Sequence, residues 1–470
     1  MIVPRHLPAV ALASALTLGG CQQLQFAPLK PLPVAGSFAA SDLPAVPAGA
    51  AAGWLGDFDS PALSRLVRGA VGGNYDLEAA AARIAQAEAQ ARIAGAGRAP
   101  RLGLDLSANR SQNLRGSEFS TVRANQFQAG LSLDWEIDLW GRLRDQTAAA
   151  LAQLDAASAD YQAARLSLAA NTAKTALDLL AARLSADLAR ETLASLQTNL
   201  DILDRQLELG NVEDSTALDI SLSRADVARA RATVATNSRA ADGFRRRLET
   251  LLGTYPAGAL DGLSTFPDIS RKVPPGLPSE LLLRRPDMRA AEARARAAIR
   301  EHSAARKALL PSIRLTGGAG TSTTQDIGDL LDLDNLVWNI GAGLTQPIFQ
   351  GGELHARAEL SKAELREVAA TYAEAALNAF REVETALAAE ILLAEEQARL
   401  DEAVEESDRA EALALSNYEN GIVDITTVLS AQRTAFEARR TRLETINLRA
   451  QNRIDLYLAL GGDFDHAPGK

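Results

Sequence analysis

The chain has few aromatic residues, a single cysteine and no concentrated positive charge. Only 4% of its 470 residues are aromatic although 47% are hydrophobic, and alanine dominates many stretches, a composition typical of long packed helices. One cysteine excludes an intramolecular disulfide framework. The formal net charge of −10, with lysine and arginine dispersed among the acids, provides no basic patch to neutralise phosphates, so we expect no nucleic-acid partner.

Residue types that carry catalysis are also scarce. Four histidines, one cysteine and two methionines leave few combinations that could supply a nucleophile, a base or a soft-metal site. The Gly341-Ala342-Gly343 pattern lacks the third glycine of a dinucleotide fingerprint, because Gln346 occupies that position. We therefore predict a protein that is not an enzyme, with no catalytic residue, no metal and no cofactor other than a lipid.

The position of the one cysteine is informative. Residues 1–20 have a positive start, an apolar run and then Leu18-Gly19-Gly20 before Cys21, the pattern of a secretory signal peptide. It resembles a bacterial lipoprotein signal, which predicts cleavage before Cys21 and lipidation of Cys21. The alternative is an ordinary secretory signal with a coincidental cysteine. No other apolar stretch reaches the ~18 to 20 residues of a membrane helix.

The second half of the chain repeats the sequence pattern of the first half without a gap. In every matching pair, the two residues are separated by the same number of positions as Asp76 and Asp287. A period this long indicates a duplicated half-molecule rather than a short solenoid unit. The matching pairs are Asp76 and Asp287, Pro100 and Pro311, Leu133 and Leu344, Ile137 and Ile348, Gly141 and Gly352, Gly210 and Gly421, and Thr216 and Thr427.

Each half predicts one very long helix and one return helix. Residues 101–255 and 348–467 contain no proline, so residues 142–209 and 353–420 can each form a helix of roughly 100 Å. In both helices apolar residues recur at alternating steps of three and four positions. This spacing predicts that each helix packs against a neighbouring helix as in a coiled coil. Each helix stops at a glycine, Gly210 or Gly421, and the return helices are expected at residues 215–252 and 426–460.

Each half also predicts two amphipathic strands. Residues 126–139 alternate strictly between apolar and polar side chains, and the same pattern marks residues 101–113, 311–320 and 336–347. Residues 109–125 and 321–335 are expected to be the polar loops of the two hairpins. A half-buried sheet in a soluble domain is one explanation. The other is a set of membrane strands, which need ~9 to 11 residues each.

Four such strands cannot close a barrel alone, and open strand edges are not tolerated in lipid, so several copies would have to combine. We expect a signal peptide at residues 1–20 and a lipidated tether at residues 21–60. The first repeat is then expected at residues 61–252 and the second at residues 286–462, with a connector at residues 253–285 between them and a C-terminal tail at residues 463–470.

Several stretches together resemble the TolC-like outer-membrane efflux proteins, specifically the lipoprotein branch (OprM/NodT-like) that works with resistance-nodulation-division (RND) pumps. The resemblance covers essentially the whole mature chain, and the order of the motifs makes it specific. The matching stretches are residues 54–77, 135–144 (WEIDLWGRLR), 282–297 (LLRRPDMRAAEARARA), 346–352 (QPIFQGG), 418–433 and 456–462 (LYLALGG).

The resemblance implies an α + β membrane protein that works as a homotrimer. Four strands per chain would form one 12-stranded outer-membrane β-barrel, continued by a long α-helical periplasmic barrel. The implied function is passive export of small molecules through the outer membrane. The implied partners are a periplasmic adaptor (membrane fusion) protein, an inner-membrane RND transporter and outer-membrane lipid, and the location is the cell outer membrane.

The resemblance also directs attention to the two helix-hairpin tips, where family members are regulated. Ungapped alignment of the halves pairs Glu213 with Asp424 and Asp219 with Ser430, with Thr426 and Thr427 between. Family members often carry aspartates where this chain has Thr427 and Ser430. A ring of Asp424 from three copies could replace them, because carboxylates brought together repel and attract cations. The alternative is that Asp424 and Glu213 only favour the positive end of a helix.

Two further groups of acids are candidates for a role. Asp134, Glu136 and Asp138 alternate with apolar residues, so they are expected to line the barrel lumen and favour cations there. The spacing of Asp326, Asp329, Asp332 and Asp334 fits no full EF-hand, and a solvated external loop is the favoured interpretation.

Two other functions fit parts of the sequence. A lipid-anchored coiled-coil spacer between envelope layers explains Cys21 and the long helices but leaves the amphipathic strands unused. An outer-membrane channel for type I protein secretion explains all of these features, and only its partners would distinguish it from an efflux channel.

Overall fold

The computed structural model describes residues 34–35, 38–40, 53–115, 120–208, 217–269, 273 and 278–462. Residues 34–470 form one compact unit, and the description that follows concerns that unit. Cys21, Gly210, Glu213, the predicted signal peptide and the C-terminal tail lie outside the described residues.

The described elements follow the same order in the two halves. α2 and α6 have 22 residues each, α3 and α7 have 67 each, and α4 and α8 have 35 each. The elements are η1 Trp54–Phe58, α1 Pro61–Gly73, α2 Tyr75–Ala96, β1 Arg101–Arg115, β2 Ser120–Ile137, α3 Arg142–Glu208, α4 Ala217–Leu251, α5 Pro278–Arg284, α6 Pro286–Lys307, β3 Ser312–Thr323, η2 Ile327–Leu331, η3 Leu333–Asn335, β4 Leu336–Thr345, α7 Glu353–Glu419 and α8 Ile425–Ala459.

Local sequence signals set the helix boundaries. The Asn74 side chain accepts hydrogen bonds from the amides of Asp76 and Leu77 and so caps α2. Gly421, which follows the C-cap residue Asn420 of α7, has a φ of 69°, a left-handed conformation that glycine adopts without steric cost. The predicted helices are therefore confirmed, with ends that differ from the prediction by a few residues at most.

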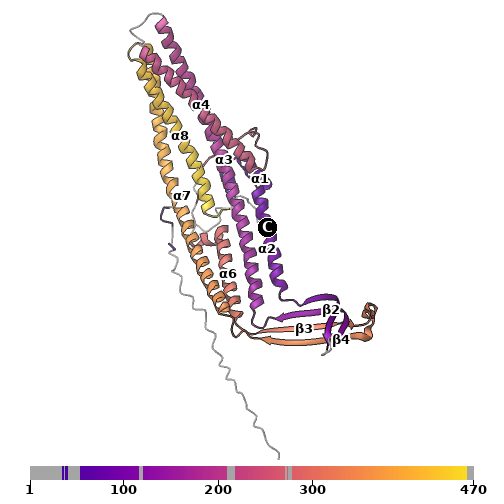
Figure 1. Ribbon diagram of the computed structural model, residues 1–470. Helices are drawn as coiled ribbons and strands as arrows, with labels where there is room; N and C mark the ends of the chain where they lie inside the picture. Colours follow the sequence, from indigo (N-terminus) through magenta and orange to yellow (C-terminus); the bar gives the residue numbers. More distant parts are fainter. Residues whose placement is uncertain are drawn as a thin grey trace, which may run out of the picture. The chain divides into compact units, whose positions relative to one another are not determined.

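The two long helices, α3 and α7, run along the unit with α8 and α6 between them (Figure 1). Away from the sheet, α3 packs against α4 and α8, and α8 packs against α7. Near the sheet, α3 packs against α2 and α6, and α6 packs against α7. No helix among the described residues has the length and apolarity required to cross a membrane.

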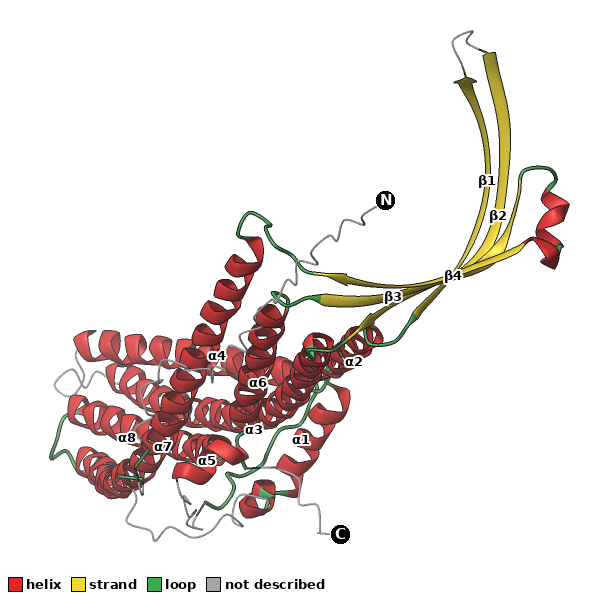
Figure 2. Ribbon diagram, turned by 90° about the horizontal axis from the view of Figure 1, so that it is seen from below, coloured by secondary structure: helices red, strands yellow, loops and turns green. Residues whose placement is uncertain are grey.

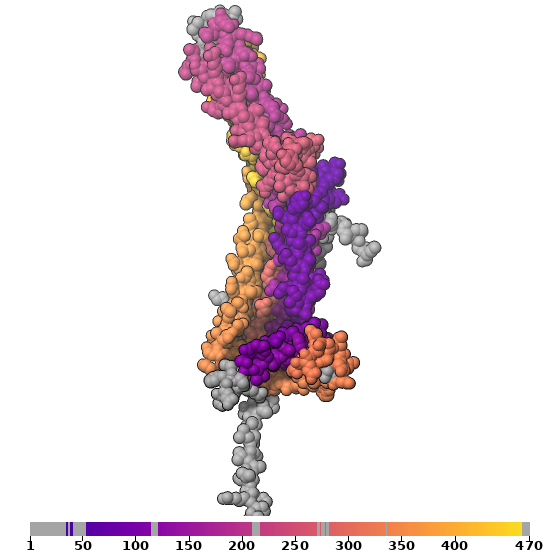
Figure 3. Space-filling view, turned by 45° about the vertical axis from the view of Figure 1, so that its right-hand side comes forward, coloured from indigo at the N-terminus to yellow at the C-terminus, as the bar shows by residue number. Residues whose placement is uncertain are grey.

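The shorter helices meet end to end. Nδ2 of Asn74, between α1 and α2, donates to the carbonyl of Leu251 at the end of α4, over 3.0 Å. Figure 3 shows the indigo and pink segments following one another along one side of the unit. In the second half, Nη1 of Arg285 donates to the carbonyl of Ala459 at the end of α8, over 3.1 Å. Each long helix is thus flanked along its length by two shorter helices in series.

The core between the helices is built mainly from alanine and leucine. Ala169, Ala173 and Ala176 are fully buried along α3, and such small side chains let helix backbones approach closely. Three buried aromatic residues meet at one place, where the rings of Trp54 and Phe58 pack on Tyr457. The low aromatic content is therefore consistent with the packing.

The strands form one antiparallel sheet in the order β1-β2-β3-β4, which extends away from the helices (Figure 2). Opposite residues share a face, and the register aligns Leu102 with Leu133, Ile137 with Ile313, and Ile313 with Leu344. One face is therefore apolar across all four strands. The helices leave it uncovered: Leu104 is 68% exposed and Ile340 is 75% exposed.

The predicted loop at residues 109–125 is wrong, because most of it is strand. β1 continues to Arg115 and β2 begins at Ser120, and Asn109 pairs with Gln126. Polar residues on both faces of these strand segments conceal the alternation of polar and apolar side chains that marks a strand in the sequence. Backbone hydrogen bonds between strands form without that alternation. The second hairpin differs, because η2 and η3 occupy the connection between β3 and β4.

Candidate functional site

The turn between α7 and α8 is held by Asp424, which is the N-cap of α8. Oδ1 of Asp424 accepts hydrogen bonds from the Thr427 amide, the Thr427 hydroxyl and the Thr426 hydroxyl, each over 2.8 Å. All three contacts use one carboxylate oxygen. The role predicted as an alternative to the gate, satisfaction of a helix N-terminus, is therefore present in the single chain.

These contacts also affect the charge of the Asp424 carboxylate. The Thr426 hydroxyl, followed by the hydroxyl and the amide of Thr427, lowers the pKa of Asp424 below its ordinary value, since all three stabilise the charged form. Asp424 is consequently a fixed negative charge at neutral pH. Its side chain is exposed at the end of the hairpin.

The other predicted tip residues lie close to this cap or at the corresponding end of the first hairpin. Thr426, Thr427 and Ser430 are exposed in the first turns of α8, and Asp219 is half-buried in the first turn of α4. Asp219 and Ser430 therefore occupy similar positions in two neighbouring hairpins.

An apolar cluster lies directly beneath the tips and joins the two hairpins. Leu203 and Val428 are fully buried in it. The buried members come from α3, α4, α7 and α8: Leu196, Leu203, Ile220, Val227, Ala230, Ala414, Ile425, Val428 and Leu429.

Polar side chains embedded beside this cluster link the hairpins further. Nδ2 of Asn199 on α3 donates to Oε1 of Gln432 on α8 over 2.8 Å, and Nε2 of Gln432 donates to Oγ of Ser195 over 2.8 Å. Asn199 and Gln432 are both buried. Closer to the tip, the Tyr418 hydroxyl donates to Oε1 of Gln206 over 3.1 Å.

A buried carboxylate adds a charged link. Asp226 on α4 pairs with Arg229 of the same helix at 2.6 Å and lies 3.9 Å from Arg433 of α8. Sequence analysis missed these links between the hairpins, because the partners lie in different halves of the chain and each alone is an ordinary polar residue on a helix. The seam of apolar residues in α3 was the one signal that placed them near an interface.

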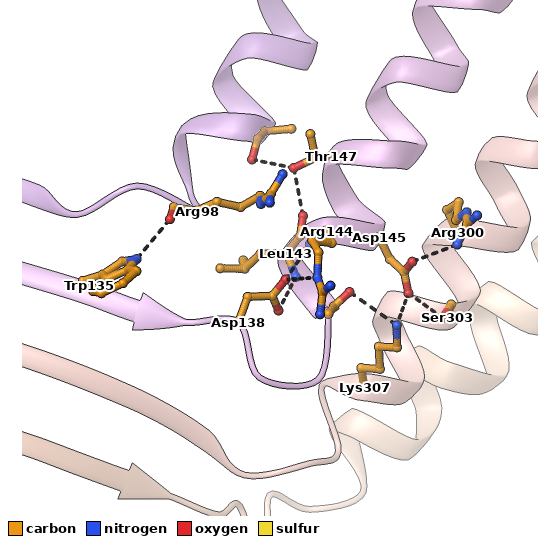
Figure 4. A network of polar contacts seen from close by, with 12 residues as sticks. Arg98, Trp135, Asp138, Leu143, Arg144, Asp145, Thr147, Arg300, Ser303 and Lys307 are labelled. Carbon is orange, nitrogen blue, oxygen red and sulfur yellow. Dashed lines mark hydrogen bonds and ion pairs between the residues drawn. The ribbon is translucent and has the colours of Figure 1, made fainter. Parts of the chain in front are cut away.

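The acids predicted for the barrel lumen are each paired with an arginine. Asp134 lies 3.4 Å from Arg314 on β3, and Glu136 lies 2.6 Å from Arg142. Asp138 lies beyond the end of β2, where its oxygens accept hydrogen bonds from the amides of Leu143 and Arg144 at the start of α3 (Figure 4). Each of these acids thus has an arginine partner within the chain, and their role in a barrel lumen stays a prediction.

The junction of sheet and helices contains a second charged cluster, on Asp145 (Figure 4). Its carboxylate accepts hydrogen bonds from Lys307 over 2.5 Å, Ser303 over 2.6 Å and Arg300 over 3.2 Å, all on α6. Burial raises the pKa of Asp145, but the contacts with Lys307 and Ser303 outweigh burial and lower it overall. Asp145 thus ties the first turn of α3 to α6.

The acids of the β3–β4 connection serve the local backbone. Asp326 caps η2 and Asp332 caps η3, and the Thr323 hydroxyl donates to Asp329. These contacts favour the predicted solvated loop over a calcium site.

Comparisons with known proteins extend over nearly the whole chain. The family model for outer membrane efflux proteins matches residues 66–254 and 277–462. The pyoverdine export outer membrane protein OpmQ of Pseudomonas putida is 35% identical, over 98% of both chains. The cation efflux system protein CusC of Escherichia coli is 31% identical over 87% of this chain and 89% of its own.

The solved structure of the outer-membrane channel OprN matches with a TM-score of 0.85 at 27% identity, covering 93% of this chain and 99% of that one. The mostly helical unit with a four-stranded sheet is therefore a fold already seen in outer-membrane channels. Sequence and structure agree that the chain is an outer-membrane protein and belongs to the outer membrane efflux protein family.

Proposed function

We propose that the protein is the outer-membrane channel of a tripartite efflux system, through which small molecules pass passively to the outside. The observation that carries the proposal is the uncovered apolar face of the sheet. An exposed apolar face that extends across four strands marks a surface that contacts lipid or another protein. Its strands are long enough to cross a bilayer when tilted.

The edges of the sheet require more than one copy. β1 and β4 each pair on one side only among the described strands, and an unpaired edge within lipid leaves backbone groups without partners. Three copies would supply twelve strands, and the polar face carrying Ser132 and Asn339 would line the lumen. The homotrimer is the arrangement that we propose.

The helices provide the length of a conduit. α3 and α7, with 67 residues each, extend about 100 Å. That is several times the ~30 Å thickness of the hydrocarbon core. The first residues of the two helices, Arg142 and Glu353, are equivalent in the sequence repeat, and so are their last residues, Glu208 and Glu419. This agreement supports the duplication. Twelve helices, two long and two composite ones from each of three copies, would form the periplasmic tunnel.

The gate is proposed at the tips. Oδ1 of Asp424 accepts the three capping hydrogen bonds, so Oδ2 can still face a threefold axis. Three such carboxylates, with Thr426, Thr427 and Ser430 around them and Glu213 and Asp219 on the other hairpin, would form a cation-attracting constriction. Lipidation of Cys21 is proposed as the membrane anchor.

The names of the relatives indicate a range of small cargo, since one is named for pyoverdine export and another for cation efflux. A periplasmic adaptor and an inner-membrane RND transporter are the proposed partners. The pump rather than the tunnel would then select the substrate.

The proposal is tested by purifying the tagged protein from its native membrane and identifying what accompanies it, followed by an export assay in a deletion strain. Recovery of an adaptor and an RND transporter, with loss of small-molecule export in the deletion strain, is the expected result. Loss of secretion of a protein substrate instead would indicate type I secretion. If export of both classes is intact and residues 321–335 resist proteases on whole cells, the spacer is the better explanation.

A further inference from the structure

One flank of α7 is exposed although the corresponding flank of α3 is covered. α3 has α2 and α4 on one side and α6 and α8 on the other, and we name its contact with α6 and α8 the intrachain interface (Figure 1). The α7 residues equivalent in the sequence repeat to α3 residues that bond to α6 or α8 include Ala356, Arg366, Thr371, Thr385, Glu406 and Ala410, all exposed.

The complementary flank of α2 and α4 is exposed as well. Leu429 on α8 is 2% exposed, whereas its repeat equivalent on α4, Leu218, is 66% exposed. On the long helices, Leu166 of α3 is 7% exposed and its equivalent Leu377 of α7 is 48% exposed. The residues of α2 and α4 equivalent to those of α6 and α8 that bond to α3 include Arg83, Ala85, Ala96, Ser221, Thr236 and Ala240, all exposed.

A second copy of the chain is the partner that fits the free flank of α7. The α2 and α4 helices of that copy would lie on α7 as α6 and α8 lie on α3, and a head-to-tail contact of this kind closes into a ring. The charges are complementary, because α7 exposes Glu395 and Glu402 and α4 exposes Arg231 and Arg239. We name this contact the intercopy interface.

Polar links run along the whole intrachain interface. Near the sheet, buried Asp145 accepts hydrogen bonds from three residues of α6. In the middle, Nδ2 of Asn447 on α8 donates to Oδ1 of Asp178 on α3 over 3.0 Å. Near the tips, buried Asn199 and Gln432 are hydrogen-bonded to each other. Separating α3 from α6 and α8 would break all of these links.

The equivalent positions of the intercopy interface cannot form these links. Three polar residues of α3 have alanine as their equivalent on α7: Ala356 replaces Asp145, Ala389 replaces Asp178 and Ala410 replaces Asn199. None of the ion pairs between α3 and α6 or α8 has opposite charges at its equivalent positions. The exposed acids of α7 and arginines of α4 offer only solvated ion pairs, which contribute little and leave no buried charge when they separate.

We infer that the tunnel opens along the three intercopy interfaces, while the two helix hairpins of each chain move as one body. The reason is that packed interfaces switch between discrete arrangements, and the interface without buried polar links is the one that switches more readily. The inference rests on the proposed function, since it requires three copies around a tunnel.

Two matched pairs of cysteines in the full-length protein test the inference. Ser195→Cys/Gln432→Cys spans the intrachain interface, where the two native side chains are hydrogen-bonded. Its repeat equivalent, Glu406→Cys/Ser221→Cys, spans the intercopy interface. Each pair is linked with a short bis-methanethiosulfonate in cells of the deletion strain, and small-molecule export is measured before and after the link is reduced. The parent, whose one cysteine is Cys21, is treated in the same way as the control.

We expect the two links to have opposite effects. The linked Glu406→Cys/Ser221→Cys protein should run as a covalent trimer on denaturing gels, lose most of its export and regain it on reduction. The linked Ser195→Cys/Gln432→Cys protein should run as a monomer and export as well as its own reduced form. If the reduced form of either variant assembles poorly, Asp178→Cys/Asn447→Cys and its equivalent Ala389→Cys/Thr236→Cys replace the two pairs.

Other outcomes would overturn the inference. If the intrachain pair links and the intercopy pair gives no covalent trimer, a second copy does not lie on this flank. If export survives the intercopy link, or is lost with the intrachain link, the tunnel opens by a different movement. If the parent itself restores no export in the deletion strain, the proposed function fails, and the inference fails with it whatever the links do.

Discussion

Asp424 shows how one side chain at the tip can have a structural and an electrostatic role. Its Oδ1 atom holds the first turn of α8 through three hydrogen bonds. A residue that only caps the helix would be replaceable by asparagine, which caps equally well without a charge. A residue that also forms part of a charged ring would not.

We predict different results for two substitutions of Asp424. Asp424→Asn should keep the thermal stability of the parent but reduce block of the channel by divalent cations, because the cap remains and the charge is lost. Asp424→Ala should reduce both. Single-channel recordings in planar bilayers and thermal unfolding in detergent measure the two effects. Unchanged cation block in the asparagine variant would remove Asp424 from the gate.

Asp145 predicts a dependence of stability on pH. Because its folded-state pKa is lowered, the carboxylate stabilises the fold fully above its unfolded pKa of about 3.9 and loses that effect as pH falls through the folded value. Asp145→Asn should lower the unfolding temperature at pH 7 and flatten its decline below about pH 4. A variant that declines as steeply as the parent would show that other acids dominate. Asp134→Asn, whose ion pair is more exposed, is the matched control.

For single residues, the sequence predicted where a side chain lies in the fold better than it predicted which other side chain it contacts. The role of Asp424 at the start of a helix was one of the two alternatives that the sequence left open, and the structure shows it as the N-cap of α8. The pairing of Asp134 with Arg314 did not, because the two residues lie in different halves of the chain and their contact depends on strand register. The same reason explains why Asn199 and Gln432 escaped notice.

The two helix hairpins are the elements on which gating would depend. Apolar packing and the contacts of Gln432, Tyr418 and Asp226 hold them together near the tips. Opening that separates the hairpins must break these contacts, since packed interfaces tend to have discrete arrangements. The strength of the links therefore bears on the closed state.

We predict that Gln432→Ala destabilises the protein by about 1–3 kcal/mol, because it leaves the buried amide of Asn199 without its partner. The double variant Asn199→Leu/Gln432→Leu should recover part of that loss, since neither position then buries an unsatisfied polar group. Chemical unfolding in detergent provides the comparison. Additive losses in the double variant would contradict a direct coupling.

Close approach of β2 and β3 makes a prediction for the sheet. A Cβ at Gly320 would lie 2.3 Å from the carbonyl oxygen of Ala129 and 2.5 Å from the Cα of Gly130. We expect Gly320→Ala to impair strand pairing and reduce the amount of assembled protein in the outer membrane. Gly343→Ala is the matched control on the same face, because a Cβ at that position would have no atom within 4 Å. Equal assembly of the two variants would contradict the close approach.

Among the elements, helices were predicted more accurately than strands. Proline-free spans and terminal glycines fixed α3 and α7 nearly to the residue. The outer part of β2, residues 120–125, was missed, because polar residues such as Arg123 and Asn125 interrupt the alternation that marks residues 126–139. Their pairing depends on backbone hydrogen bonds and on the neighbouring strand.

At the scale of the whole molecule, the sheet of one chain has two open edges and one uncovered apolar face among the described residues. The internal duplication gives each copy two similar hairpins, so three copies would have approximate sixfold symmetry. Sequence alone predicted this arrangement through the family resemblance and the incompatibility of open edges with lipid.

The most direct test of the channel is thiol modification of two adjacent residues on opposite faces of β2. Ser132 lies on the polar face and Leu131 on the apolar face, and the parent protein, whose one cysteine is Cys21, is the control. Current through purified Ser132→Cys in planar bilayers should fall after a bulky charged methanethiosulfonate is added, while Leu131→Cys and the parent should be unaffected. Block of the Leu131→Cys variant instead, or no current from any of the three proteins, would contradict a channel lined by the polar face.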